Sequence, residues 1–215
     1  KPLMHVWENI IYVIAIATMF IGNLFALRQQ NMKRFLAFSS IAQAGFILLG
    51  FITGNQLGTT TIVYFVMIYI FSNLAAFGVV QAISLQTGKE NMNDYNGLYR
   101  TNPNLSLIMM LALFSLAGIP PVAGFFGKIF LFTAAASKGY YFLVFLAVVN
   151  VTISLYYYLL VIRAMFLRKS ENAIPFFKNK IYMRLGLIIT VIGILVIGLY
   201  SPLYEYIYEL SSIFN

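Results

Sequence analysis

The sequence has no cysteine, one histidine and only six acidic residues among its 215 residues. The absence of cysteine excludes disulfides and thiolate-bound metals. One histidine and six scattered carboxylates disfavour a protein-bound metal or haem centre. The sequence also shows neither a phosphate-binding loop nor a recognisable pair of nucleophile and base. We therefore expect no cofactor in this chain and no chemistry on a bound substrate.

Charge is scarce as well. Only 9% of the residues are charged, whereas 61% are hydrophobic and 17% aromatic, and the mean hydropathy is +0.85. A soluble domain carries about 25% charged residues, so the composition predicts an all-α integral membrane protein. The formal net charge of +8 would suggest nucleic acid as the partner of a soluble protein. Here it is better explained by basic loops that orient the chain in the bilayer, and no nucleic-acid partner is expected.

Six apolar runs, each bounded by charged or turn residues, are long enough to cross a bilayer. They are Ile10–Leu27, Phe35–Ile52, Thr59–Leu85, Leu105–Ala136, Tyr140–Ile162 and Leu185–Tyr200. After the last run, apolar residues recur at helical spacing through Leu203–Phe214, with Glu205 and Glu209 opposite them. This stripe predicts a short helix that lies at the membrane interface or packs against a neighbouring subunit.

The fourth run, Leu105–Ala136, is too long and too rich in helix breakers for one straight helix. A continuous helix of that length would rise about 48 Å, whereas the hydrocarbon core is about 30 Å thick. We therefore predict a discontinuous helix with its break across Gly118–Lys128. The residues that supply the break are Gly118, Pro120, Pro121, Gly124 and Gly127. Broken helix at membrane depth is tolerated where protein buries it or where it lines a wet cavity.

Lys128 is placed near the bilayer midplane by its position in this run. It precedes Ser137 and Lys138, the predicted end of the run, by about 15 Å of helix, which is half of the hydrocarbon thickness. A charged side chain costs about 2.5–3.5 kcal/mol there on insertion scales. One interpretation is a lysine that extends to the headgroups, although 15 Å exceeds the reach of one side chain. The other is a buried lysine that loads and releases a proton, because desolvation disfavours its charged form.

Other polar residues fall within the predicted spans. Ser39, Ser40 and Gln43 lie on one face of the second span, where they either join helices or line a water path for protons. Asn23 carries the same two interpretations. Ser72 and Asn73 are interpreted as hydrogen-bonding groups between helices. The run Tyr156–Tyr158, near a span end, is interpreted as an aromatic belt with packing.

The basic residues are distributed unequally between the two faces. The loops after the first, third and fifth spans hold eleven of the fourteen: Arg28, Lys33, Arg34, Lys89, Arg100, Arg163, Arg168, Lys169, Lys178, Lys180 and Arg184. The opposite face has Lys1 and Lys138. Positively charged loops remain in the cytoplasm, so we expect both termini on the periplasmic side.

Three stretches resemble, in order and spacing, the antiporter-like membrane subunits of respiratory complex I. They are GNLFALRQQNMKRFLAFSSIAQAGFILLG, LALFSLAGIPPVAGFFGKIFLF and VVNVTISLYYYLLVIRAMFL. The resemblance covers essentially the whole chain and is closest to the branch called subunit N. It implies that residues 1–215 are the C-terminal portion of such a subunit, helices nine to fourteen of fourteen. The first residues, Lys1-Pro2, also suggest a piece of a longer protein or a processed chain.

The resemblance implies roles for individual residues. Lys128 matches the lysine on the broken helix that is proposed to pass protons toward the outer side. Lys33 and Arg34 match the basic pair at the cytoplasmic start of a helix, and Ser39 and Ser40 match the serine pair that follows. Gln43 stands where many relatives carry histidine, so a directly titrating relay is not expected at this position.

Three hypotheses follow for the function. In the first, the chain is a proton-conducting part of a proton-pumping NADH-quinone oxidoreductase in the bacterial inner membrane. Its partners are then the other membrane subunits and the lipid bilayer, and NAD, FMN, iron–sulfur clusters and quinone belong to other parts of the complex. In the second, it belongs to a multisubunit sodium/proton antiporter, a family that shares these motifs. In the third, the helices are a scaffold and Lys128 never titrates.

Overall fold

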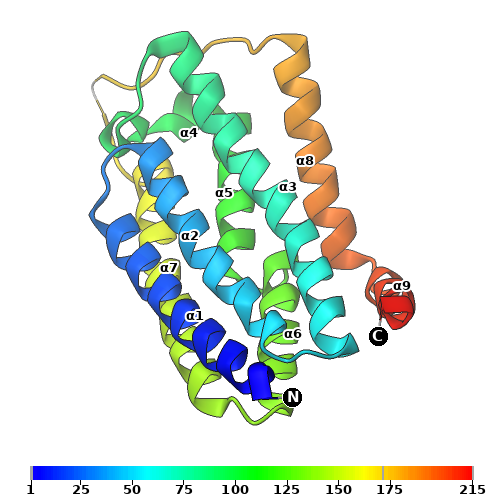
Figure 1. Ribbon diagram of the computed structural model, residues 1–215. Helices are drawn as coiled ribbons and strands as arrows, with labels where there is room; N and C mark the ends of the chain where they lie inside the picture. The colour runs from blue at the N-terminus through cyan, green and yellow to red at the C-terminus, as the bar shows by residue number, and fades with distance from the viewer. Residues whose placement is uncertain (1, 171, 215) are drawn as a thin grey trace.

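A computed structural model describes residues 2–170 and 172–214, apart from the side chains of residues 2–6 and 214. All regular structure in these residues is helical (Figure 1). The long helices are α1 (Pro2–Arg28), α2 (Met32–Phe51), α3 (Gln56–Thr87), α7 (Tyr141–Phe166) and α8 (Ile181–Leu199). Two shorter apolar helices, α5 (Pro103–Ala117) and α6 (Ala123–Ser137), follow one another. The remaining elements are η1 (Met92–Tyr95), α4 (Leu98–Thr101), α9 (Pro202–Ser211) and η2 (Ser212–Phe214).

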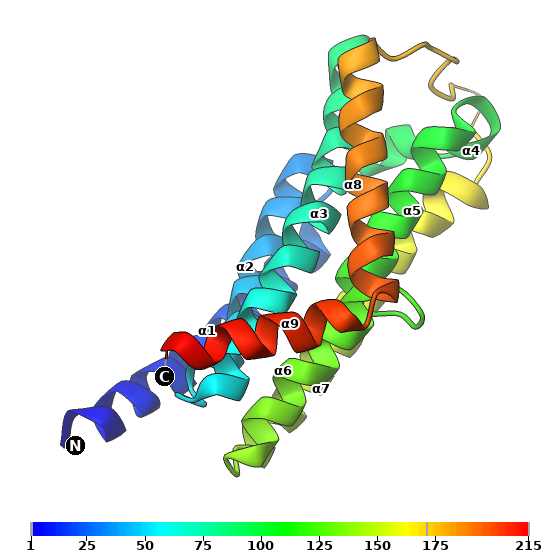
Figure 2. The same ribbon diagram turned by 90° about the vertical axis from the view of Figure 1, so that its right-hand side faces the viewer.

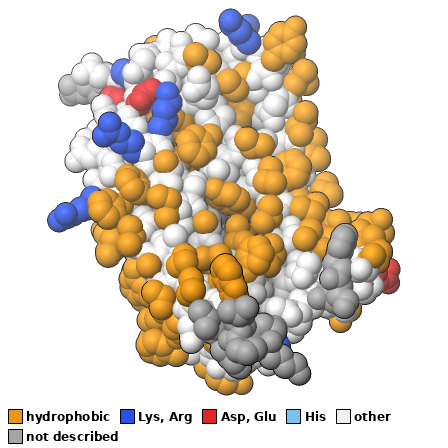
Figure 3. All heavy atoms as spheres, in the orientation of Figure 1, with side chains coloured by type: hydrophobic (Ala, Val, Ile, Leu, Met, Phe, Trp, Pro, Cys, Tyr) orange, Lys and Arg blue, Asp and Glu red, His pale blue; other side chains and the backbone are white. Residues whose placement is uncertain are grey.

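The helices confirm the prediction of an all-helical membrane protein. Five of them in the described residues, counting α1 from Trp7, are long and apolar enough to cross a membrane. α3 lies in the middle of the bundle and packs against α2, α5, α6, α8 and α9. The surface in Figure 3 is largely apolar along the flank of the bundle, and charged side chains gather toward one end. This arrangement suits a chain whose flank faces lipid.

The helix break lies where the prolines predict it but is shorter than expected. α5 ends at Gly118, whose positive φ of 82° is a conformation that suits glycine. A turn follows, and α6 begins after Val122. Gly124 and Gly127 therefore belong to α6, and the prediction that the discontinuity extends to Lys128 is wrong. No proline lies between Pro121 and the end of α6, so every residue there has an amide N–H and the helix can resume.

Gly124 and Gly127 instead allow close packing. A Cβ on Gly124 would lie 1.7 Å from the backbone oxygen of Ser115, and one on Gly127 would lie 2.9–3.0 Å from side-chain atoms of Ile68 and Phe65. Because Gly124 has no side chain, α6 can approach the last turn of α5 closely. This contact fixes how the two halves of the broken segment lie beside each other.

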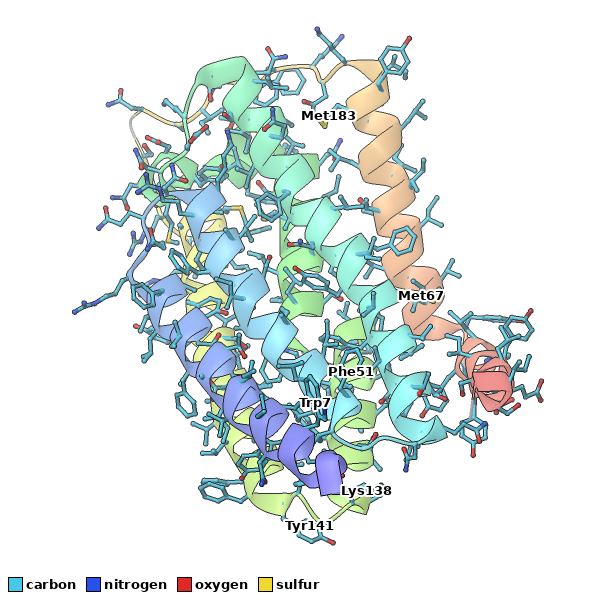
Figure 4. The ribbon with its side chains drawn as sticks, viewed as in Figure 1. Trp7, Phe51, Met67, Lys138, Tyr141 and Met183 are labelled. Atoms are coloured by element: carbon cyan, nitrogen blue, oxygen red, sulfur yellow. The ribbon has the colours of Figure 1, made fainter. Side chains whose placement is uncertain are left out.

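The basic residues gather at one end of the bundle, because the loops that carry them lie there. The loops after α1, α3 and α7 meet at one end of the bundle, at the top of Figure 1, whereas α1 begins and α9 lies at the other. We call the first of these the basic end, because it holds the eleven Lys and Arg residues of the predicted set. Figure 4 places Lys138 and Tyr141 at the opposite end and Met183 at the basic end. Lys1, predicted for the opposite face, lies outside the described residues.

A clasp between two loops, not predicted from the sequence, closes part of the basic end. Asn31 and Asn91 form an isolated antiparallel bridge, and the amide of Met32 donates to the Glu90 carbonyl at 2.8 Å. Lys33 Nζ forms an ion pair with Glu90 at 2.5 Å, and Glu90 also accepts from Ser84. These hydrogen bonds lower the pKa of Glu90 to about 2, and the bond from Lys33 contributes most. The carboxylate therefore stays ionised over the physiological pH range.

α9 is the helix predicted for the tail, and it crosses the bundle at a steep angle (Figure 2). The Tyr204 ring packs against Tyr64 of α3 and Phe130 of α6. Gln56 Nε2 donates to the Tyr208 carbonyl, and Thr60 shares a hydrogen bond with Ser211. These contacts attach α9 to the beginning of α3, within this chain.

Gly124→Ala tests the close packing of the broken segment. We expect a loss of about 1–3 kcal/mol or more in unfolding free energy, because the backbone of Ser115 cannot move out of the way as a side chain could. The control is Gly186→Ala on α8, where an added Cβ meets nothing within 4 Å. Thermal unfolding in detergent measures both variants. Equal stability of the two would contradict the packing role of Gly124.

The Lys33–Glu90 ion pair predicts a specific pH dependence of stability. Folding lowers the pKa of Glu90 from 4.5 to about 2, so the contribution is complete above pH 4.5 and is lost as the pH falls toward 2. The difference in melting temperature between wild type and Glu90→Gln should be constant from pH 7 to 5 and shrink below pH 4.5. Glu205→Gln, at an exposed position of α9, is the control. A difference that shrinks between pH 7 and 5 would contradict the assignment.

Candidate functional site

Lys128 lies in the second turn of α6 and is only 3% exposed. Its Nζ atom donates to the backbone oxygens of Leu116 at 2.7 Å and of Ala117 at 3.1 Å. Both oxygens belong to the last turn of α5. The amine thus binds the carboxyl end of the preceding half-helix, where the helix dipole favours a positive charge.

The two acceptors are free because of the prolines. In a continuous helix the oxygens of Leu116 and Ala117 would accept from the amides four residues later. Those residues are Pro120 and Pro121, which have no N–H. The sequence that breaks the helix therefore also creates the site that Lys128 occupies.

The surroundings of Lys128 are otherwise apolar. Its Nζ lies 4.9 Å from the centre of the Phe46 ring, and its Cδ would be 3.0 Å from a Cβ on Gly118. In the described part of the chain, no carboxylate forms an ion pair with it. A neutral amine satisfies both carbonyls with its two N–H groups, and an ammonium has a third proton that neither carbonyl accepts. The site therefore accommodates both charge states and can hold or release one proton.

A chain of hydrogen bonds leads from this site toward the basic end. Gln43 of α2 donates from Nε2 to the Leu116 oxygen at 3.0 Å, so this oxygen is shared with Lys128. The same amide lies 3.3 Å from the Tyr158 hydroxyl of α7. That hydroxyl is hydrogen-bonded to Ser39, one turn from Gln43. Ser39, Gln43 and Tyr158 are all buried.

Ser40 does not take part in this series of hydrogen bonds. Its hydroxyl donates at 2.9 Å to the Leu36 oxygen of its own helix, and it is only partly buried. The structure thus brings Ser39 and Gln43 together through Tyr158 and leaves Ser40 beside them. The sequence places all three residues on one face of the helix, and this pattern alone does not show that Ser40 is outside the hydrogen-bonded series.

The run Tyr156–Tyr158, interpreted as an aromatic belt with packing, divides between the two roles. Tyr156 is 59% exposed, but Tyr157 and Tyr158 are fully buried. A polar stripe along α7 could have revealed them, since Asn150 and Ser154 precede Tyr157 and Tyr158 at helical spacing. This stripe faces the interior of the bundle.

Asn23 joins α1 to the same stripe. Its side-chain nitrogen donates to the side-chain and backbone oxygens of Asn150, at 2.9 and 3.1 Å, and its oxygen accepts from Tyr157 at 2.8 Å. Ser72 of α3 donates to Ser115 of α5 at 2.7 Å, which confirms the predicted bond between helices. Asn73 instead donates to Tyr69 of its own helix. These bonds hold α1, α3, α5 and α7 around the Lys128 site.

A metal centre has no support among the residues that the structure describes. They contain no group of three or more His, Cys, Asp or Glu side chains that could hold an ion. The chemistry that this arrangement offers is proton transfer at an amine, beside hydroxyl and amide groups.

Comparisons with known proteins identify the family of this chain. Residues 2–154 match the family model described as NADH:quinone oxidoreductase/Mrp antiporter, TM. NADH-quinone oxidoreductase subunit N of Phocaeicola vulgatus is 51% identical over 205 residues, which are 95% of this chain and 43% of that protein. The chain thus spans less than half the length of this relative.

Solved structures share the fold. A chain of respiratory complex I from Thermus thermophilus with bound aureothin is 33% identical, with a TM-score of 0.78 over 91% of this chain and 44% of that one. A chain of the Mrp complex from a Dietzia species is 22% identical, with a TM-score of 0.86 over 96% of this chain and 47% of that one, and shows the fold alone. The chain belongs to the family of antiporter-like membrane subunits of NADH:quinone oxidoreductase and Mrp antiporters, and it is a homologue of subunit N.

Proposed function

We propose that this chain conducts protons across the membrane as part of the subunit N of a proton-pumping NADH-quinone oxidoreductase, with Lys128 as the group that is loaded and unloaded. The observation that carries the proposal is a buried amine held by two carbonyl oxygens, without a carboxylate partner among the described residues. Redox chemistry on NAD, FMN, iron–sulfur clusters and quinone takes place elsewhere in the complex. The partners of this chain are the other membrane subunits.

In this proposal α5 and α6 together make a sixth crossing, and the basic end faces the cytoplasm. The positive-inside rule supports that orientation, because eleven basic residues lie at one end. The membrane is then the bacterial inner membrane, and residues 1–215 form the C-terminal portion of the subunit. The clasp of Lys33 and Glu90 lies at the cytoplasmic side of the proton path.

Ser39, Gln43 and Tyr158 line the proton path toward Lys128. An amide, an aliphatic hydroxyl and a phenol all remain un-ionised at neutral pH, so the proton moves through water that these groups orient. Unloading transfers the third ammonium proton to such a water, and loading returns a proton to the amine. The two bonds to Leu116 and Ala117 persist in both steps, so Lys128 need not leave its site.

A sodium/proton antiporter is the alternative within the same family. The shared fold does not separate the two functions. Sodium is a hard cation that prefers oxygen ligands, and the six predicted spans contain no Asp or Glu that could supply a carboxylate to hold it. Proton pumping that is independent of sodium favours the proposal, and proton movement that requires sodium favours the antiporter.

Lys128→Arg tests the role of deprotonation. Arginine keeps the positive charge and the donors for the two carbonyls but hardly releases a proton. We expect the complex to assemble and proton transfer through this position to slow about tenfold or more, since a positioned proton-transfer group contributes about 100-fold or more in rate. Lys138→Arg, at the exposed end of α6, is the control. Pumping is measured in vesicles with a pH-sensitive dye, and unchanged pumping would favour the scaffold hypothesis.

Lys128→Ala separates structure from function at the same position. It removes the Lys128 donor from the buried Ala117 oxygen, at a cost of about 1–3 kcal/mol, whereas the Leu116 oxygen keeps its hydrogen bond from Gln43. We expect lower thermal stability together with lost pumping in the fraction that assembles. Normal stoichiometry in an assembled Lys128→Ala complex would refute the proposal.

Tyr158→Phe tests the hydrogen-bond chain. It removes the hydroxyl that joins Ser39 to Gln43 and keeps the buried ring. We expect slower pumping with a stability change of about 1–2 kcal/mol at most. Tyr156→Phe, on the exposed face of the same helix, is the matched control. Wild-type pumping rates in Tyr158→Phe would exclude the hydroxyl from the path.

A further inference from the structure

A groove of about 640 Å³ separates α5 from α8 on the outside of the bundle. Its volume lies within the range of about 300–1,000 Å³ that is typical of small-molecule clefts. Apolar side chains of the two helices form its walls: Leu107, Ile108, Leu187, Ile188, Val191 and Ile192. Figure 2 shows α5 and α8 side by side, with the loop that precedes α8 above them.

The rim of this groove is polar and basic. Lys178 and Arg184 line it, together with the amides of Asn104 and Asn179. Both cations are exposed, and neither forms an ion pair or side-chain hydrogen bond with any residue that the structure describes. No acidic residue is among the lining residues. The charge of the rim therefore suits an anion.

The loop at the rim is held in place by a buried side chain. Asn102 donates to the Pro175 oxygen at 3.1 Å, and its own oxygen accepts from the Phe177 amide at 3.4 Å. These bonds fasten the segment that carries Lys178 to the beginning of α5. The position of this cation relative to the apolar walls is thus part of the fold.

The depth of the groove distinguishes a lipid from a helix as its occupant. The lining residues of α8 extend from Arg184 to Ile192, eight residues further along the helix, which is about 12 Å of helical rise. Half of the hydrocarbon core is about 15 Å thick, so the apolar walls extend through one leaflet only. A transmembrane helix of a partner would need a surface about twice as deep. An acyl chain beneath a headgroup matches both the depth and the charge.

We propose that this groove binds one anionic phospholipid of the leaflet at the basic end. Its acyl chain lies between α5 and α8, and its phosphate lies between Lys178 and Arg184. Basic pockets between transmembrane helices are suited to anionic headgroups. This inference does not depend on proton transfer at Lys128.

The first experiment measures lipid retention by native mass spectrometry. The intact membrane complex that contains this chain is delipidated and then titrated with phosphatidylglycerol or phosphatidylcholine. We expect one tightly held phosphatidylglycerol whose affinity falls about tenfold to thirtyfold in the Lys178→Gln/Arg184→Gln double variant, the effect of two interfacial cations. The control is Lys180→Gln, an exposed cation of the same loop that does not line the groove. Equal retention of both lipids, or an unchanged affinity in the double variant, would overturn the proposal.

A second pair of variants tests the apolar walls. Ile188→Phe fills the groove, whereas Ile189→Phe adds the same volume at an exposed neighbouring position outside it. We expect only the first to release the bound lipid, with normal assembly in both. A photo-crosslinking residue at position 192 then identifies the occupant directly. A crosslink to phospholipid supports the proposal, and a crosslink to another subunit overturns it.

Discussion

The two hydrogen bonds from Lys128 to the oxygens of Leu116 and Ala117 are the interaction on which the centre of this structure depends. Pro120 and Pro121 free these oxygens by withholding the amides that a helix would supply. An unsatisfied carbonyl in an apolar surrounding costs about 1–3 kcal/mol, so the break requires a donor. A buried amine equally requires acceptors. The break and the lysine therefore stabilise each other.

Packing brings the donor to its acceptors. The chain does not reverse its direction at the break, because α6 continues in the general direction of α5 (Figure 1). The side chain of Lys128 must therefore extend back toward the end of α5 to reach its acceptors. The absence of a side chain at Gly124 lets the first turn of α6 lie against Ser115, and the stem of Lys128 passes Gly118. Gln43 binds the same Leu116 oxygen from α2. One carbonyl thus couples the broken segment to the helix that leads to the basic end.

The sequence predicts the helices, the break and the burial of Lys128, because each depends on local composition: apolar length, adjacent prolines and the distance of a lysine from the end of its run. It does not predict which side chains meet across long separations. Tyr158 is 119 residues from Ser39, and Glu90 is 57 residues from Lys33. The local sequence pattern of α7 does not predict that α7 packs against α2. Gly124 and Gly127 were assigned to the break for the same reason, since their role is contact with other backbone and side chains.

Two lysines of this chain show how partners decide the chemistry of one residue type. Lys33 faces Glu90, whose pKa of about 2 keeps the carboxylate charged throughout the physiological range. This ion pair joins the beginning of α2 to the loop that follows α3. Lys128 faces carbonyl oxygens, which accept hydrogen bonds from an amine and, more strongly, from an ammonium. A carboxylate in place of Leu116 and Ala117 would bind the cation more strongly and hold its proton. The prolines therefore expose two neutral acceptors that bind the Lys128 amine without a counter-charge, and this arrangement is the basis of the proton-transfer role proposed for it.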